Sequence, residues 1–205
     1  FKGQFFVENR PGAGQSIGIE VAARSEPDGY TLLMAASTLA LNPIMYKNIK
    51  YDPVKDFAPI SQVASIPNVV LVHPSVPAKT LKELIALAKS KPGELTYASA
   101  GIGAYQHINT EILAKRAGGL KLVHIPFKDG GAGILKDVAG GDTHVSWFNV
   151  TNPVGMIKAG KVRPLAVAAA QRLPAWPDVP TLEEIGVKDA ASDTFQGIYV
   201  LAGTP

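Results

Sequence analysis

One unit recurs along the chain and constrains its fold most: a short apolar run passes through a loop of small residues into a helical pattern. It is clearest at Tyr97–Gly118, where the loop Ser99–Ala104 has almost no side-chain bulk. The residues from His107 onward then repeat at helical spacing. Alternation of strands and helices in this way predicts an α/β fold, with a core of parallel strands flanked by helices.

The loops of this unit are the predicted binding places, because ligands in open α/β sheets lie beyond the carboxyl ends of the strands. Four stretches qualify, all rich in small and amide residues and poor in acids: 36–39, 99–105, 127–131 and 149–152. In 99–105 the loop leads into a helix start, whose N–H groups and positive dipole end suit a carboxylate or a phosphate. An ordinary tight turn between strand and helix explains the same pattern, and both interpretations stay open.

Shorter signals predict individual elements. Thr80-Leu81-Lys82-Glu83 matches a capping box and predicts a helix that begins after Thr80. The apolar runs 5–7 and 30–35 predict strands, and the second is continuous enough for a strand covered on both faces.

Composition excludes several classes of protein. The chain has 205 residues, of which 46% are apolar and 18% charged, as in a globular protein with a real core. Its net charge is +3 with scattered basic residues, which does not support nucleic-acid binding. No apolar run reaches the length of a membrane span. There are no cysteines, and the four histidines do not pair at metal-ligand spacing, so neither a metal nor a cofactor is predicted.

A hydrolase is the competing interpretation. Gly14-Gln15-Ser16-Ile17-Gly18 matches G-x-S-x-G, the nucleophile elbow of α/β-hydrolases, with Ser16 as the nucleophile. The elbow places its serine directly at a strand end, whereas here residues 8–13, including Pro11, separate the apolar run from Ser16. The glycines at 12, 14 and 18 are one residue too widely spaced for a dinucleotide fingerprint.

Four side chains near the loops are interpreted individually. His107 lies in the first turn of the central helix, where it either orients the loop or contacts a ligand, or is simply structural. His124 lies in an apolar run and is interpreted as structural. Lys128 is the one cation beside a candidate loop, and a solvated surface lysine is the alternative role. Tyr105 either walls a pocket or packs in the core.

Several motifs run through the chain in a fixed order. They are Val7–Gly14, Pro27–Leu33, Tyr51–Pro59, Tyr97–Gly103 with His107, Val123–Lys128 and Leu173–Thr181. In this order the chain resembles, from end to end, the periplasmic substrate-binding receptors of tripartite tricarboxylate transporters, the Bug receptor family.

The resemblance implies a two-lobed periplasmic binding protein of type II-like architecture, with crossing strands near Ile60–Val72 and Val162–Ala170. Lobe one would comprise residues 1–66 and 168–205, and lobe two residues 67–167. Family members begin with a further strand, loop and helix and continue with further helices. Lobe one is therefore expected to be incomplete and the chain truncated at both ends.

The resemblance also implies a function without catalysis. The lobes would close on a small mono-, di- or tricarboxylate for delivery to membrane transporter subunits. The protein would be a periplasmic monomer without a cofactor, made with a signal peptide. The implied ligand-binding residues are Ser37, Thr38, Ser99, Ala100, Gly101, Gly103, Ala104, Tyr105, His107, Lys128, Gly130 and Asn149.

One departure from the family bears on the ligand. Members with amino-acid ligands often carry an aspartate at or beside the tip of the strand that matches Ser146–Asn149. This chain has Phe148 and Asn149 there. The resemblance therefore predicts a ligand without an ammonium group.

Overall fold

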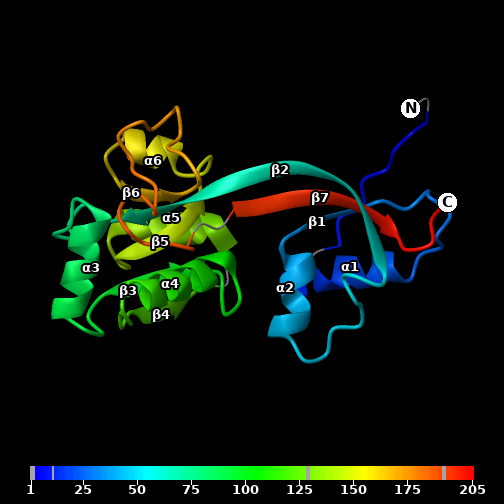
Figure 1. Ribbon diagram of the computed structural model, residues 1–205, viewed down its shortest axis with the longest axis horizontal. Coiled ribbons are helices and arrows are strands. Elements are labelled where there is room, and N and C mark those ends of the chain that lie inside the picture. The colour runs from blue at the N-terminus through cyan, green and yellow to red at the C-terminus, as the bar shows by residue number, and fades with distance from the viewer. Residues whose placement is uncertain (1–2, 11, 128–129, 191–192) are drawn as a thin grey trace. The chain divides into compact units, whose positions relative to one another are not determined.

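The computed structural model describes residues 3–10, 12–127, 130–190 and 193–205 (Figure 1). The chain divides into two compact units. Unit 1 comprises Phe1–Ser65 and Phe195–Pro205, and unit 2 comprises Ile66–Thr194. Among the described residues, none of the helices combines the length and apolar character needed to cross a membrane.

Unit 1 is a small α/β layer. It contains a 3₁₀ turn η1 (Ala13–Gln15), helices α1 (Ser16–Ala23) and α2 (Thr38–Met45), and strand β1 (Leu33–Ala36). Parts of β2 (Phe57–Val72) and β7 (Asp193–Leu201) complete it. β1 pairs with β7 in antiparallel fashion, so the strand pairing described in this unit is not parallel. Its core is formed by Ile19, Ala22, Ala35, Leu39, Tyr51, Phe57 and Leu201.

The first predicted strand is absent from this unit. Residues 4–10 form no regular element, and Phe6 is 90% exposed. An apolar pattern alone does not make a strand, which also needs a regular ladder of backbone hydrogen bonds, and residues 4–10 are not part of such a ladder. The run 30–35 does contribute a strand, which begins later than predicted, at Leu33.

Unit 2 has the predicted parallel core. Its elements, in chain order after the second half of β2, are α3 (Leu81–Ser90), β3 (Thr96–Ser99), α4 (Tyr105–Arg116), β4 (Val123–Pro126), α5 (Gly130–Gly140), β5 (Val145–Asn149), α6 (Val154–Lys158) and β6 (Arg163–Ala168). β5, β3 and β4 are parallel, whereas β2 pairs antiparallel with both β5 and β6. The α/β prediction is confirmed, with a mixed rather than wholly parallel sheet.

Side chains of the unit 2 sheet alternate between two buried layers. Val70, Tyr97 and Trp147 point into a core with α3 and α4, which supply Leu81, Leu84 and Leu113. Val69, Ala98 and Phe148 belong to a second core, with Ile134 and Val138 of α5 and Met156 of α6. Because successive residues of a strand face opposite ways, a sheet covered on both faces needs such continuous apolar runs.

The return to unit 1 lies later than the resemblance implied. Residues 168–190 belong to unit 2, because the segment after β6 packs on its sheet. Val167 forms a parallel bridge with Thr181, and Leu182 and Val187 are buried in the core with α3 and α4. The strand that leads back is therefore β7, and not a strand near Val162–Ala170.

Candidate functional site

The loop between β3 and α4, residues 100–104, leads from the parallel core to a helix without a side-chain cap. Ser99 ends β3, and Ala104 occupies the N-cap position in an extended conformation (φ −63°, ψ 152°). Gly101 and Gly103 have φ values of 115° and 84°, which L side chains rarely adopt. The N–H groups of the first helical turn are thus open to an acceptor such as a carboxylate.

The amides within the loop already have partners. The Gly101 N–H donates to Ser99 Oγ at 3.0 Å, and the Gly103 N–H donates to His107 Nδ1 at 3.4 Å. The Ala104 N–H donates to the Gly101 carbonyl at 3.2 Å. Ser99 itself is fully buried. In this conformation the loop is held by its own contacts, and the helix start that follows it has no side-chain cap.

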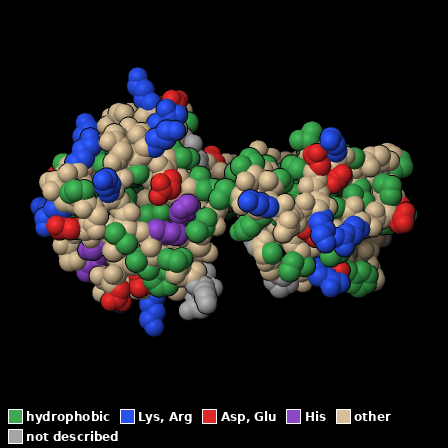
Figure 2. Space-filling model, turned by 90° about the horizontal axis from the view of Figure 1, so that it is seen from below, with side chains coloured by type: hydrophobic (Ala, Val, Ile, Leu, Met, Phe, Trp, Pro, Cys, Tyr) green, Lys and Arg blue, Asp and Glu red, His purple; other side chains and the backbone are tan. Residues whose placement is uncertain are grey.

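Three rings stack behind the loop. The Tyr97 and His124 rings lie 4.8 Å apart at 18°, and the His124 and His107 rings lie 4.7 Å apart at 43°. His124 Nε2 is 2.5 Å from Ser99 Oγ. Burial and, secondly, the neighbouring His107 lower the pKa of His124. Figure 2 shows histidine side chains grouped beside hydrophobic and acidic ones on the face that it presents.

His124, for which the sequence predicts a structural role, contacts Ser99 at the start of the candidate loop. The parallel register of β3 and β4 places His124 opposite Tyr97 and so brings it behind the loop. Tyr97 in turn donates its phenolic hydrogen to Glu111 Oε1 at 3.0 Å. Burial, followed by the Glu111 carboxylate, raises the pKa of Tyr97, which keeps the phenol protonated.

Tyr105 connects the start of α4 to the end of β5. Its phenol is hydrogen-bonded to the backbone of Asn149, and burial raises the pKa of Tyr105 to about 12. Three buried polar atoms lie on these two elements without a hydrogen-bond partner among the described residues: Gln106 Oε1, Trp147 Nε1 and Asn149 Oδ1. This region therefore keeps hydrogen-bonding capacity that a water or a ligand can use.

The other predicted residues are more dispersed. The Phe127 N–H donates to the Ser99 carbonyl at 2.7 Å, so the chain after β4 begins against the same strand end. Gly130 is the first residue of α5. Lys128 lies outside the described residues.

Ser37 and Thr38 belong to unit 1. Ser37 occupies the N-cap position of α2 but makes no side-chain cap there, and the Thr38 hydroxyl is hydrogen-bonded to Gln15 Oε1. Both residues are half-buried. Their role in ligand binding stays a prediction.

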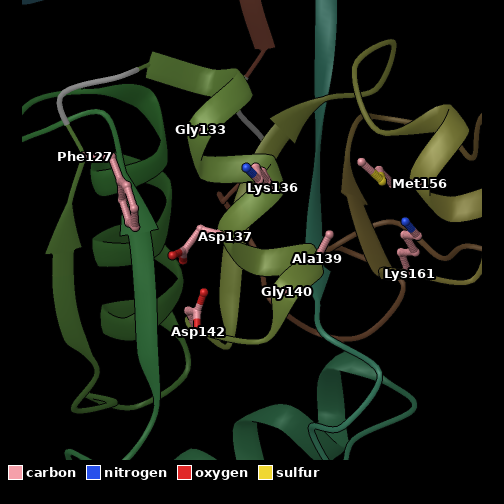
Figure 3. Close-up of a pocket in the computed structure, with 9 residues that line it drawn as sticks. All are labelled: Phe127, Gly133, Lys136, Asp137, Ala139, Gly140, Asp142, Met156 and Lys161. Carbon is pink, nitrogen blue, oxygen red and sulfur yellow. The ribbon is translucent and has the colours of Figure 1, made fainter.

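A cavity of about 510 Å³ lies along α5, and among the predicted site residues whose side chains the structure describes, none lines it. Figure 3 shows Asp137 and Asp142 on the side of Phe127, with Met156 and Lys161 on the other side of the helix. The Thr143 hydroxyl donates to Asp137 Oδ2. The cavity combines acidic and basic side chains, a poor match to one small anion.

Ser16 does not sit in a nucleophile elbow. It begins α1 directly after the 3₁₀ turn η1, and no strand precedes it within residues 3–10 and 12–15. Its side chain is buried and its hydroxyl accepts a hydrogen bond from Asn42 Nδ2 at 2.8 Å. All four histidines belong to unit 2, whereas Ser16 belongs to unit 1. These contacts give Ser16 a structural role at a helix start.

Comparison with known proteins adds independent evidence. Residues 3–205 match the family described as "Tripartite tricarboxylate transporter family receptor". Among curated relatives, a UPF0065 protein of Bordetella pertussis is 34% identical over 200 residues, which cover 97% of this chain and 61% of the relative. "Protein BugT" of the same organism is 32% identical over 200 residues, with 97% and 61% covered. The chain thus spans about three fifths of the length of these relatives.

Solved structures show the same similarity. "R. palustris Rpa4515 with adipate" superposes with a TM-score of 0.86 at 32% identity, covering 98% of this chain and 67% of that one. "Structure of periplasmic binding protein BugD" gives 0.82 at 34% identity, with 97% and 66% covered. "MatC (Rpa3494) from Rhodopseudomonas palustris with bound malate" gives 0.78 at 28% identity, with 95% and 66% covered.

Proposed function

Because the chain belongs to the tripartite tricarboxylate transporter receptor family, we propose that it is a solute-binding receptor for a small carboxylate without an ammonium group. The observation that carries the proposal is the start of α4, which follows a glycine loop and has no side-chain cap. A helix start of this kind favours a carboxylate through its N–H groups and its dipole. Two similar structures are described with adipate and with bound malate, which supports this class of ligand.

The proposed contacts in unit 2 follow from the geometry of the loop. The first-turn amides of α4, after Ala104, donate to one carboxylate group. Tyr105 and Asn149 line the neighbouring surface, where Asn149 Oδ1 and Gln106 Oε1 have no described partner. Acceptor oxygens of this kind suit a hydroxyl or a bound water rather than a second carboxylate.

Membership of the family supports a wider role as part of the proposal. The receptor delivers its ligand to membrane transporter subunits, works in the periplasm as a monomer and performs no catalysis. Ser37 and Thr38 of unit 1, and Lys128 and Gly130, belong to the proposed set of binding residues as the resemblance implies.

A thermal-shift screen of the 205-residue chain tests the proposal. The panel contains adipate, malate, succinate and citrate, with aspartate and glutamate as ammonium-bearing controls. A ligand that binds only the folded state at 100 times its Kd adds about 2.7 kcal/mol to the free energy of unfolding and so raises the Tm. A rise with a plain carboxylate, confirmed by calorimetry, supports the proposal. A preference for aspartate or glutamate overturns the ligand class, and no rise with any acid overturns carboxylate capture by this chain.

A further inference from the structure

We propose that His107 and His124 are positioning residues that hold the loop 100–104 in its binding conformation, His124 by way of Ser99. The inference rests on the proposed function in one respect: the ligand that this loop would bind is the carboxylate proposed above. The contacts between the imidazoles and the loop do not depend on a ligand, so they are tested separately.

His107 holds the second glycine of the loop. The Gly103 N–H donates to His107 Nδ1 at 3.4 Å, and an imidazole nitrogen accepts a hydrogen bond only when it carries no proton. The neutral ring must therefore carry its hydrogen on Nε2. Protonation of Nδ1 would turn two donors toward each other and break the contact with Gly103.

His124 holds the first glycine indirectly. Ser99 Oγ lies 3.0 Å from both the nitrogen and the carbonyl oxygen of Gly101 and 2.5 Å from His124 Nε2. A hydroxyl has one hydrogen to donate. When His124 Nε2 is unprotonated, Ser99 donates to it and accepts from the Gly101 N–H. When Nε2 carries a hydrogen, His124 donates to Ser99, and the Ser99 hydrogen turns to the Gly101 carbonyl.

The two imidazoles act as a unit because their rings are in contact. Their centroids lie 4.7 Å apart, so a charge on one disfavours a charge on the other. Among the described residues, the other titratable groups that face them are Tyr97 of β3, stacked on His124, and Glu111 of α4, which accepts the Tyr97 hydrogen bond. The Glu111 carboxylate acts on the pKa of His124 in the opposite direction to burial and His107. The loop conformation is thus linked to the ionisation of this whole stack.

This arrangement assigns Ser99 a different role from the one that the resemblance implied. Ser99 is fully buried, and its hydroxyl faces the loop and His124. It acts on a ligand through the backbone of Gly101. The imidazoles and Ser99 together select one loop conformation among those that two glycines permit.

The first experiment needs no ligand. The amide shifts of Gly101 and Gly103 are followed by NMR against pH in the ¹⁵N-labelled 205-residue chain. We expect both amides to titrate together with the two imidazoles. His107→Asn, whose side-chain oxygen can replace Nδ1 as an acceptor without ionising in this range, should abolish the titration of the Gly103 amide. Amides that do not follow the imidazoles would overturn the inference.

His144→Asn is the matched control. His144 Nδ1 accepts the Thr96 N–H at 3.0 Å, which is the same kind of contact at the opposite end of β3. This variant should change the pH dependence of the Thr96 amide and leave Gly101 and Gly103 as in the wild type. If His144→Asn alters the loop amides as strongly as His107→Asn, the link is not specific and the inference is overturned.

The second experiment uses adipate as the probe at pH 8. Loss of a hydrogen bond that orders the loop should lower affinity about five- to tenfold in His107→Ala and in His124→Ala. His107→Asn and His124→Gln retain an acceptor and should bind within about threefold of the wild type. Equal affinity in the alanine variants would overturn the positioning role. If the wild type binds no carboxylate, the proposed function fails, and the amide titration alone decides whether the imidazoles hold the loop.

Discussion

Helices α3 and α4 of unit 2 pack on the same face of the sheet but begin in opposite ways. At the start of α3, Thr80 Oγ1 accepts from the Glu83 N–H at 3.2 Å, and the Glu83 carboxylate accepts from the Lys79 N–H at 2.6 Å. At the start of α4, Ala104 offers no side-chain acceptor. Helix α3 therefore caps its own start with side chains, whereas α4 leaves its first-turn N–H groups without a side-chain acceptor, as the proposed binding of a carboxylate requires.

The largest expected effect comes from the glycine loop that precedes α4 but not α3. Gly101→Val forces a branched side chain into a φ of 115°. Strain of about 1–3 kcal/mol, relieved by moving the loop, should lower adipate affinity about ten- to a hundredfold in calorimetry. Gly93→Val is the control, because Gly93 also has a positive φ (82°) and open space around a Cβ but lies after α3. Equal loss of affinity in both variants would remove the site from the loop.

The difference between the two helix starts can also be removed by giving α4 a side-chain cap. Ala104 already has the extended backbone of an N-cap residue, so Ala104→Asp should place a carboxylate on the first-turn N–H groups. The variant should gain about 0.5–2 kcal/mol in the free energy of unfolding. It should lose about tenfold in adipate affinity, because its own carboxylate occupies the donors. Ala104→Val adds bulk without an acceptor, and a similar loss in that variant would contradict the explanation by capping.

Removal of the cap from α3 should affect stability alone. Thr80→Ala loses the acceptor for the Glu83 N–H and should cost about 1 kcal/mol in urea unfolding, with adipate affinity unchanged. Thr80→Ser keeps the hydroxyl and should restore most of the loss. A fall in affinity in Thr80→Ala would mean that the two helix starts are not independent.

The smallest effect concerns acid stability. Because burial and His107 lower the pKa of His124 in the folded state, the unfolded chain binds this proton more readily. The resulting contribution to stability is complete above the unfolded pKa, about 6.5, and is lost as the pH falls through the folded value. Urea midpoints at pH 8 and pH 5 should therefore differ less in His124→Gln than in the wild type. An equal difference would show that His124 does not carry the effect.

Local patterns predicted the elements of unit 2 well, because their signals are contained in a few consecutive residues. The capping box at Thr80 marked the start of α3, and the small loop after Tyr97 marked the turn into α4. Contacts between distant segments were not predictable in the same way. His124 meets Ser99 only through the pairing of β3 with β4, and the run 5–7 forms no strand although its pattern is apolar.

The buried Trp147 gives this protein an optical property of its own. Its indole is 1% exposed and shares the α4-side core with Tyr105, and its Nε1–H has no partner among the described residues. Indole emission depends on the polarity around the ring, so this side chain should emit at short wavelength. Any rearrangement at the start of α4 that admits water or supplies an acceptor should shift its spectrum to longer wavelength. The molecule therefore carries a fluorophore within the same core as its proposed binding helix.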